Sequence, residues 1–235
     1  MDNTKGNIVL IKNFAKHLVG KFRISDDGTH LGAITFGKTV NIRLLFSDFQ
    51  GSKINLQNVE KQIDSWHGDS FVNNRHTRIS EALRTAKDFL FKTAGGMRSP
   101  PIQQVLVLFT NGKQDKGQLS STLSEAQKLR HKGIKLIAVG IQKPDLVNLV
   151  KIASNELNVY FLKTPDRIVS IAKKIVQSLC DEVDGNQRDV EDICFVIYLC
   201  NSFCKYLHFR IGNLPNSPPQ AAILTSSAGG LQKCK

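Results

Sequence analysis

The sequence lacks the features that mark a membrane protein or a secreted precursor. Its longest apolar run is about seven residues, Ile193 to Leu199, whereas a membrane-spanning helix needs about 20. We therefore expect no transmembrane helix and no insertion into a membrane. Met1 to Gly6 show no charged stretch followed by an apolar one and a small-residue cleavage site, so no signal peptide is expected in this chain.

Cysteine is scarce and confined to one end of the chain. None occurs before residue 180, and an odd set in the last quarter fits neither a paired disulfide framework nor a zinc site with Cys-x-x-Cys spacing. The redox compartment is therefore left open by the sequence. The five positions are Cys180, Cys194, Cys200, Cys204 and Cys234.

Motifs of the common enzyme classes are missing as well. No Gly-x-Gly-x-x-Gly follows a predicted strand, and there is no Walker-type Gly-Lys-Ser/Thr and no Gly-x-Ser-x-Gly elbow. Gly95-Gly96 follows a predicted helix, which is typical of a helix end and turn. The 6 histidines show neither an i, i+4 pair nor zinc-ligand spacing. We expect a protein that is not an enzyme and that needs no cofactor.

Charge is the most uneven property of the 235 residues, which carry a net charge of +12. Nearly all of the excess lies before residue 180. The lysines are scattered singly, without interleaved exposed aromatics, so we expect no nucleic-acid binding. Binding of acidic glycans stays open, because a basic surface attracts polyanions. The candidate residues for it are Lys12, Lys16, Lys21, Arg23, Lys128, Arg130, His131, Lys132 and Lys135.

The hydrophobic pattern alternates between helices and strands up to residue 180. Helices are predicted over 8–19, 55–66, 79–92, 121–132 and 165–179, with one more opened by Pro144 at its first position. Strands are predicted over 31–36, 40–46, 104–109, 134–139 and 159–162. This alternation predicts a doubly wound α/β sheet. Its ligands would bind at the carboxyl ends of the strands, near the loops after 36, 109 and 140 and the loop 70–78.

Several of these stretches resemble the von Willebrand factor type A domain. Val105 to Gly112 resembles the family's strand that ends in Thr-Asp-Gly, and Lys135 to Ile141 is similar to the strand after it. Asp27 to Gly32 resembles the entry to the family's hairpin, and the closing elements match near Val159 and Ile175. The resemblance covers about residues 2–180 and implies a mostly parallel, Rossmann-like sheet flanked by helices, with its first strand missing before Met1.

The resemblance also implies a metal-ion-dependent adhesion site, here degenerate. The family holds a divalent cation such as Mg²⁺ with Asp-x-Ser-x-Ser after the first strand, a loop Thr and the Asp of Thr-Asp-Gly. Thr77 matches the loop Thr, but Asn111 replaces the Asp, and Asp2 falls at the last Ser of the missing motif. Neutral Asn111 is a weak ligand for a hard cation. Thr77 and Asn111 are therefore vestigial candidates, with a helix N-cap and a turn residue as the alternatives.

The last quarter of the chain changes character. We expect a linker over 181–192, a strand-like segment over 193–211 and a disordered tail over 212–235. The segment from Asp192 resembles the family's first strand, with Tyr198 at the position of the motif's Asp, Cys200 at that of its first Ser, and Ser202 matching the second. It is either the start of a second unit, as in tandem arrays of type VI collagen and matrilin-like proteins, or a permuted central strand. In the second case 193–199 lies parallel to 104–109, and Ser202 joins the candidate site.

Three functions remain open. By resemblance the chain is an extracellular protein-binding module that contacts an extracellular-matrix or cell-surface protein. Alternatively, it is a truncated fragment with a structural role only, or a basic module that binds glycosaminoglycans. The family's cysteine partner before the first strand is also missing. Cys180 is therefore expected to be free or bonded to a cysteine of the tail.

Overall fold

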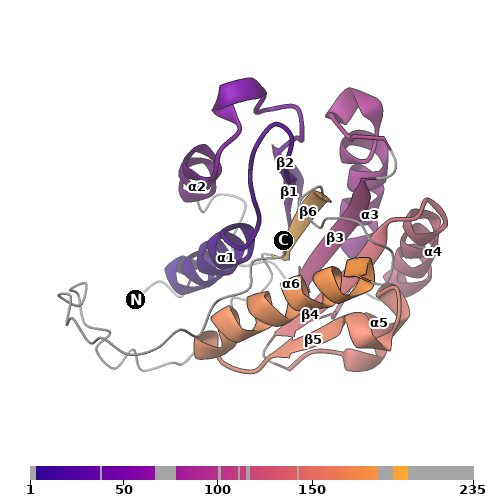
Figure 1. Cartoon of the computed structure of the whole chain (residues 1–235). Helices are drawn as coiled ribbons and strands as arrows, with labels where there is room; N and C mark the ends of the chain where they lie inside the picture. Colours follow the sequence, from indigo (N-terminus) through magenta and orange to yellow (C-terminus); the bar gives the residue numbers. More distant parts are fainter. Residues whose placement is uncertain are drawn as a thin grey trace.

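The computed structural model describes residues 4–37, 39–66, 78–99, 102–110, 112–114, 117–141, 143–184 and 193–200. Within these ranges the structure describes the backbone alone for residues 4–8, 10, 165, 180–184 and 193–200. A 6-stranded sheet forms the centre of the molecule, in the order β2-β1-β6-β3-β4-β5 (Figure 1). β2 is antiparallel to β1, and all other neighbouring strands are parallel. The strands are β1 His30–Phe36, β2 Val40–Leu44, β3 Gln103–Thr110, β4 Lys135–Ile141, β5 Val159–Leu162 and β6 Ile193–Cys200.

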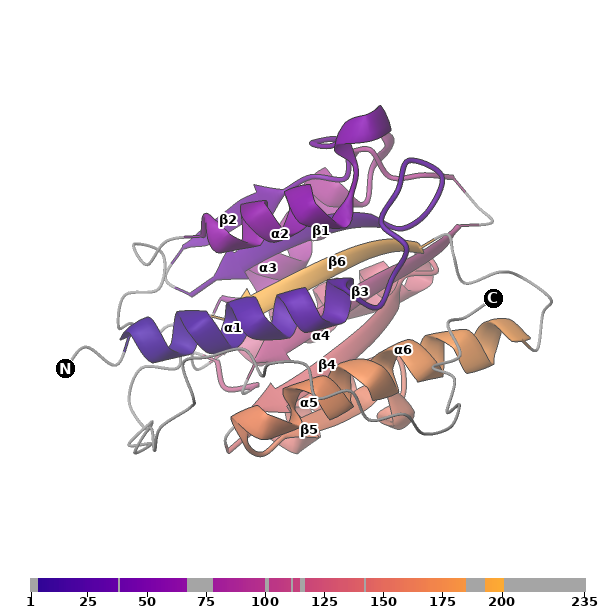
Figure 2. The ribbon, with the colours of Figure 1, turned by 60° about the vertical axis from the view of Figure 1, so that its left-hand side comes forward.

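Helices cover both faces of the sheet, as the doubly wound prediction required. α1, α2 and α6 lie on one face, and α3, α4 and α5 lie on the other (Figures 1 and 2). The helices are α1 Thr4–Val19, α2 Leu56–Asp64, α3 Ile79–Thr85, α4 Gln118–His131, α5 Leu146–Ile152 and α6 Ile168–Asp184. Short helical turns are η1 Gly51–Lys53, η3 Ala86–Leu90, η4 Thr93–Gly95, η5 Glu156–Asn158 and η6 Pro165–Arg167. No helix within the described ranges combines the length and the apolar character needed to cross a membrane.

The tail segment supplies the central strand of the sheet. β6 is parallel to β1, with His30 opposite Cys194, and parallel to β3, with Phe109 opposite Leu199. The prediction that 193–199 lies parallel to 104–109 is therefore confirmed. Figure 2 shows β6 between β1 and β3 as the yellow-orange strand. Without it, the hairpin β1–β2 and the strands β3 to β5 would share no backbone ladder.

The core is apolar on both sides of the sheet. β3 and β4 are buried over almost their whole length, as expected for strands covered by helices on both faces. On one face the ring of Phe14 in α1 stacks on Phe109 in β3, with ring centroids 4.6 Å apart. Trp66 and Phe36 are also fully packed, at 2% and 0% exposure. Each such side chain contributes roughly 1.5–3 kcal/mol of burial free energy.

Three local predictions need correction. Pro144 does not open a helix: Asp145 is the N-cap of α5, because its carboxylate accepts a hydrogen bond from the Asn148 N–H. The predicted helix 79–92 is α-helical only to Thr85 and continues as a π-helical turn, η3, in which the N–H of Phe91 donates to the carbonyl of Ala86. α6 runs on to Asp184, so that the first four residues of the predicted linker 181–192 are helical.

Candidate functional site

The carboxyl ends of the parallel strands β1, β6, β3 and β4 meet along one edge of the sheet. The chain leaves β1 on one side of β6 and reaches β3 on the other, so the crevice of this sheet lies at the end of β6. Doubly wound sheets bind their ligands at such a point. The last residues of the three central strands there are Phe36, Cys200 and Thr110, with Cys200 opposite Phe36. This edge is the candidate functional site.

The turn after β3 is held tightly against the start of α5. The Thr110 hydroxyl is fully buried and accepts a hydrogen bond from the Gly112 N–H at 3.2 Å. Gly112 has φ +72°, and a Cβ there would lie 3.1 Å from the carbonyl oxygen of Asp145. The positive φ favours glycine, because other residues adopt it only with strain, and a Cβ would also need the Asp145 carbonyl to shift. Gly112, the residue after Asn111, therefore lies in a close-packed turn with a fixed backbone conformation.

Polar side chains of α3 and α4 form a second layer behind this edge. Ser80 at the start of α3 is 4% exposed and donates its hydroxyl to Gln118 Oε1 of α4 at 3.1 Å. Thr122, also buried, donates to Gln114 Oε1, and among the described residues the buried Nε2 group of Gln114 has no hydrogen-bond partner. These residues tie the loop after β3 to the helices, and the sequence analysis did not single them out. The sequence did hold a signal for Ser80 and Thr122: each is a polar residue at a position where the helical spacing predicts a buried, apolar one.

Three residues were predicted as candidate metal ligands. Thr77, Asn111 and Ser202 all lie outside the described residues. The N-cap position of α3 belongs to Arg78, one residue after Thr77, and Arg78 makes no side-chain cap bond. For Tyr198 and Cys200 the backbone is described. Both belong to the last three residues of strand β6, which lies between β1 and β3. In the described part of the chain, no three His, Cys, Asp or Glu side chains form a group that could hold a metal ion.

The basic residues predicted to bind polyanions are divided between the two faces of the sheet. Lys12 and Lys16 belong to α1, whereas Lys128 and Arg130 belong to α4 on the opposite face. Several are already engaged: Lys16 pairs with the Asp64 carboxylate at 2.6 Å, and Arg130 donates to the carbonyl of Ile152 at 2.7 Å. The predicted set therefore does not form one continuous surface.

Comparison with known proteins places the chain in a family. The profile of the von Willebrand factor type A domain matches residues 2–174. The chain is 25% identical over 195 residues to the human collagen alpha-5(VI) chain, covering 80% of this chain but 7% of that protein. It is also 25% identical over 180 residues to chicken matrilin-1, covering 76% of this chain and 34% of the relative. The chain thus spans only a small part of the length of the relatives it matches.

Solved structures share the same fold. Proximal thread matrix protein 1 from the mussel byssus superposes with a TM-score of 0.64 at 25% identity, covering 73% of this chain and 42% of that one. Manganese-loaded TRAP protein from Plasmodium vivax superposes with a TM-score of 0.54 at 16% identity, covering 70% of this chain and 65% of that one. The family match extends over most of the chain. The sheet of this chain has the doubly wound strand order that the family implies. The chain belongs to the von Willebrand factor type A domain family.

Proposed function

We propose that this chain is a non-enzymatic protein-binding module of the extracellular matrix, and that its metal-ion-dependent adhesion site is degenerate. The partner is a matrix or cell-surface protein that docks at the carboxyl edge of the sheet without a bridging divalent cation. The similarity to collagen VI chains and to matrilin-1 supports the matrix setting. The sequence at the end of the central strand supports the loss of the cation.

The carrying observation is the position of β6. It lies between β1 and β3, which is the place that the family resemblance gives to the first strand and its Asp-x-Ser-x-Ser. In β6 the corresponding positions hold Tyr198 and Cys200, and the turn after β3 holds Asn111. Both carboxylates of the family's ligand set are thereby replaced by neutral groups. A hard cation prefers charged oxygen ligands, so Thr77 and Ser202 alone do not hold Mg²⁺ at a useful affinity.

The same observation supports one domain that ends with β6. We infer that residues 1–184 and the segment 193–200 form a single circularly permuted domain, with 185–192 as the connection between them. The alternative is that 193–211 opens a second unit. Two ladders of seven residue pairs each bind β6 into this sheet.

Calorimetric titration of the purified chain with Mg²⁺ or Mn²⁺ tests the cation part of the proposal. We expect no binding in the micromolar range, and no shift of the thermal unfolding midpoint when the cation is added. Asn111→Asp restores one carboxylate only, so we expect that it does not restore binding. A micromolar Kd for Mg²⁺ in the unchanged chain would contradict the proposal.

Surface binding to a panel of purified matrix proteins tests the docking edge. We expect binding that is the same in Mg²⁺ and in EDTA. Lys143 lies exposed just after β4 at the carboxyl edge, and Lys132 lies exposed before β4 at the opposite edge. Lys143→Glu should weaken binding, whereas the matched control Lys132→Glu should not. Equal effects of the two substitutions, or binding abolished by EDTA, would refute docking at this edge.

A further inference from the structure

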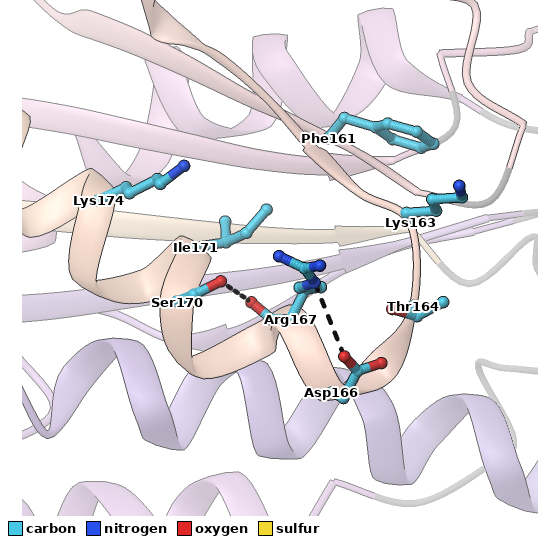
Figure 3. A pocket seen from close by; sticks show the side chains of 8 residues that line it. All are labelled: Phe161, Lys163, Thr164, Asp166, Arg167, Ser170, Ile171 and Lys174. Carbon is cyan, nitrogen blue, oxygen red and sulfur yellow. Dashed lines mark hydrogen bonds and ion pairs between the residues drawn. The ribbon is translucent and has the colours of Figure 1, made fainter.

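A hollow lies at the outer side of the sheet, between the end of β5 and the start of α6 (Figure 3). Its volume is about 520 Å³. It forms where the chain leaves Leu162, turns through η6 and enters α6 at Ile168. Two strands, β3 and β4, separate β5 from the central strand β6. The hollow is therefore distinct from the crevice at the end of β6.

Three cationic side chains and one carboxylate line the hollow. Lys163, Arg167 and Lys174 are exposed, and Figure 3 shows the Arg167 guanidinium between Ile171 and Lys163. Among the described residues, Lys163 and Lys174 make no ion pair or side-chain hydrogen bond. Asp166 faces Arg167 at 3.8 Å, a distance that leaves most donors of the guanidinium unused. The site thus presents exposed cationic donors that are available to an anionic ligand.

Hydroxyl groups and apolar side chains complete the lining. The Ser170 hydroxyl donates to the carbonyl of Arg167 at 2.9 Å and keeps its lone pairs, and the Thr164 hydroxyl bonds to Asp166. Ile171 is buried at 6% exposure, whereas Phe161 is 42% exposed, so part of this aromatic side chain is open to a ligand. The electron-rich face of such a ring attracts weakly positive C–H groups. The hollow therefore combines cations with an exposed aromatic surface.

We propose that this hollow binds an acidic glycan, a sugar chain that carries sulfate or carboxylate groups. Lys163, Arg167 and Lys174 contact the anionic groups through charge-assisted hydrogen bonds, and Phe161 packs against the C–H face of a sugar ring. A free inorganic anion would use the cations but not the ring. This activity lies outside protein docking at the carboxyl edge, and neither depends on the other.

Calorimetry with a heparin-derived tetrasaccharide at about 0.15 M salt tests the site, since long-range attraction is largely screened there. The test protein is the whole chain with three lysine or arginine charges removed from the hollow, and the matched control loses three charges at exposed lysines elsewhere. We expect the first to bind at least tenfold more weakly and the second to bind within twofold of the unchanged chain. The first carries Lys163→Gln, Arg167→Gln and Lys174→Gln, and the second carries Lys53→Gln, Lys61→Gln and Lys92→Gln.

Two single substitutions and two further probes sharpen the result. Asp166→Asn removes the opposing carboxylate and should strengthen binding severalfold. Phe161→Thr should weaken binding of the tetrasaccharide and leave that of inorganic sulfate unchanged. A desulfated tetrasaccharide, which keeps its carboxylates, shows which anionic group is recognised.

Several results would overturn the proposal. Equal losses in the two triple variants would mean attraction to net charge alone. Inorganic sulfate that binds as tightly as the tetrasaccharide would mean a simple anion site. No measurable binding of either tetrasaccharide by the unchanged chain would also rule it out. Thermal unfolding of each variant checks that the fold is kept, which the exposure of these side chains favours.

Discussion

The Glu125 carboxylate in α4 accepts hydrogen bonds from two ammonium groups, that of Lys87 in η3 at 2.5 Å and that of Lys128 at 2.8 Å. Its side chain is 11% exposed and that of Lys87 is 15% exposed, so both charges have left most of their water. Burial by itself opposes ionisation of Glu125. The hydrogen bonds from Lys128 and Lys87 outweigh that effect and lower the pKa of the carboxyl below its ordinary value. The pair thereby joins α4 to the π-helical turn η3.

Glu125→Gln should destabilise the chain by about 1–3 kcal/mol, because it removes the nearer counter-charge of the largely buried Lys87 ammonium and leaves only the Asp88 carboxylate, 3.8 Å away. Urea unfolding measures this as a lower midpoint at an unchanged slope. Glu156 is exposed and serves as the control: Glu156→Gln should change the free energy of unfolding by less than about 0.5 kcal/mol. An equal effect at both positions would show that the pair is not a stabilising contact.

The pH dependence of the same pair has a definite sign. The folded-state pKa of Glu125 is lowered, so its contribution is complete above the unfolded-state pKa of about 4.3 and is lost as the pH falls through the folded-state value. The difference in unfolding free energy between the unchanged chain and Glu125→Gln should therefore be constant near neutral pH and shrink below about pH 4. Urea unfolding at a series of pH values measures it. A difference that grows on acidification would contradict this assignment.

β6 is the element on which the sheet depends, and a substitution within it tests this. Val196 lies opposite Gly32 of β1 and Leu106 of β3. Val196→Pro removes a backbone donor from the middle of the sheet, at a cost of about 1–3 kcal/mol for the acceptor left unpaired, and the ring adds a steric conflict. We expect loss of the cooperative unfolding transition or a clearly lower thermal midpoint.

Val196→Ala is the matched control, because it shortens the side chain and keeps the N–H. It should unfold cooperatively with a smaller loss. Circular dichroism during heating compares the two variants. If they unfold alike, β6 is not held in the sheet by its backbone ladder.

Apolar patterning was enough to predict most elements. Val105 to Phe109 and the strand that ends at Ile141 are continuous apolar runs because helices cover both of their faces. Helix ends were less predictable. Pro144 was expected to open α5, but the helix begins after Asp145, whose carboxylate accepts a hydrogen bond from the Asn148 N–H. The spacing of apolar residues does not reveal such a bond. The π-helical turn at Ala86 follows from packing between elements, which the local sequence does not encode.

The candidate site was predictable in its location and not in its chemistry. The carboxyl edge follows from strand order, and the tail strand could be assigned to the empty centre because an unpaired central slot is costly. The hollow lined by Lys163 and Lys174 was not foreseen. Its cations lie just after β5, in η6 and in α6, and they meet only after the chain has turned at Pro165.

The molecule should unfold as one unit although its sheet is built from two parts. The hairpin β1–β2 and the strands β3 to β5 are linked through β6, and α1 packs Phe14 onto Phe109 of β3. Scanning calorimetry should therefore show a single transition with equal calorimetric and van't Hoff enthalpies. Two separable transitions would mean that the hairpin half and the β3–β5 half are stable independently.

The strand at the middle of the sheet is also the last of the six to leave the ribosome. At about 5–20 residues per second, the stretch between β3 and β6 takes several seconds to synthesise. During that time β1 and β3 each present a strand edge that the finished protein covers completely. Such edges pair with any extended segment nearby, including those of neighbouring nascent chains. A chain that stops before Ile193 would keep both edges open, so translation arrest in this region should produce aggregates that a chaperone or protease must remove.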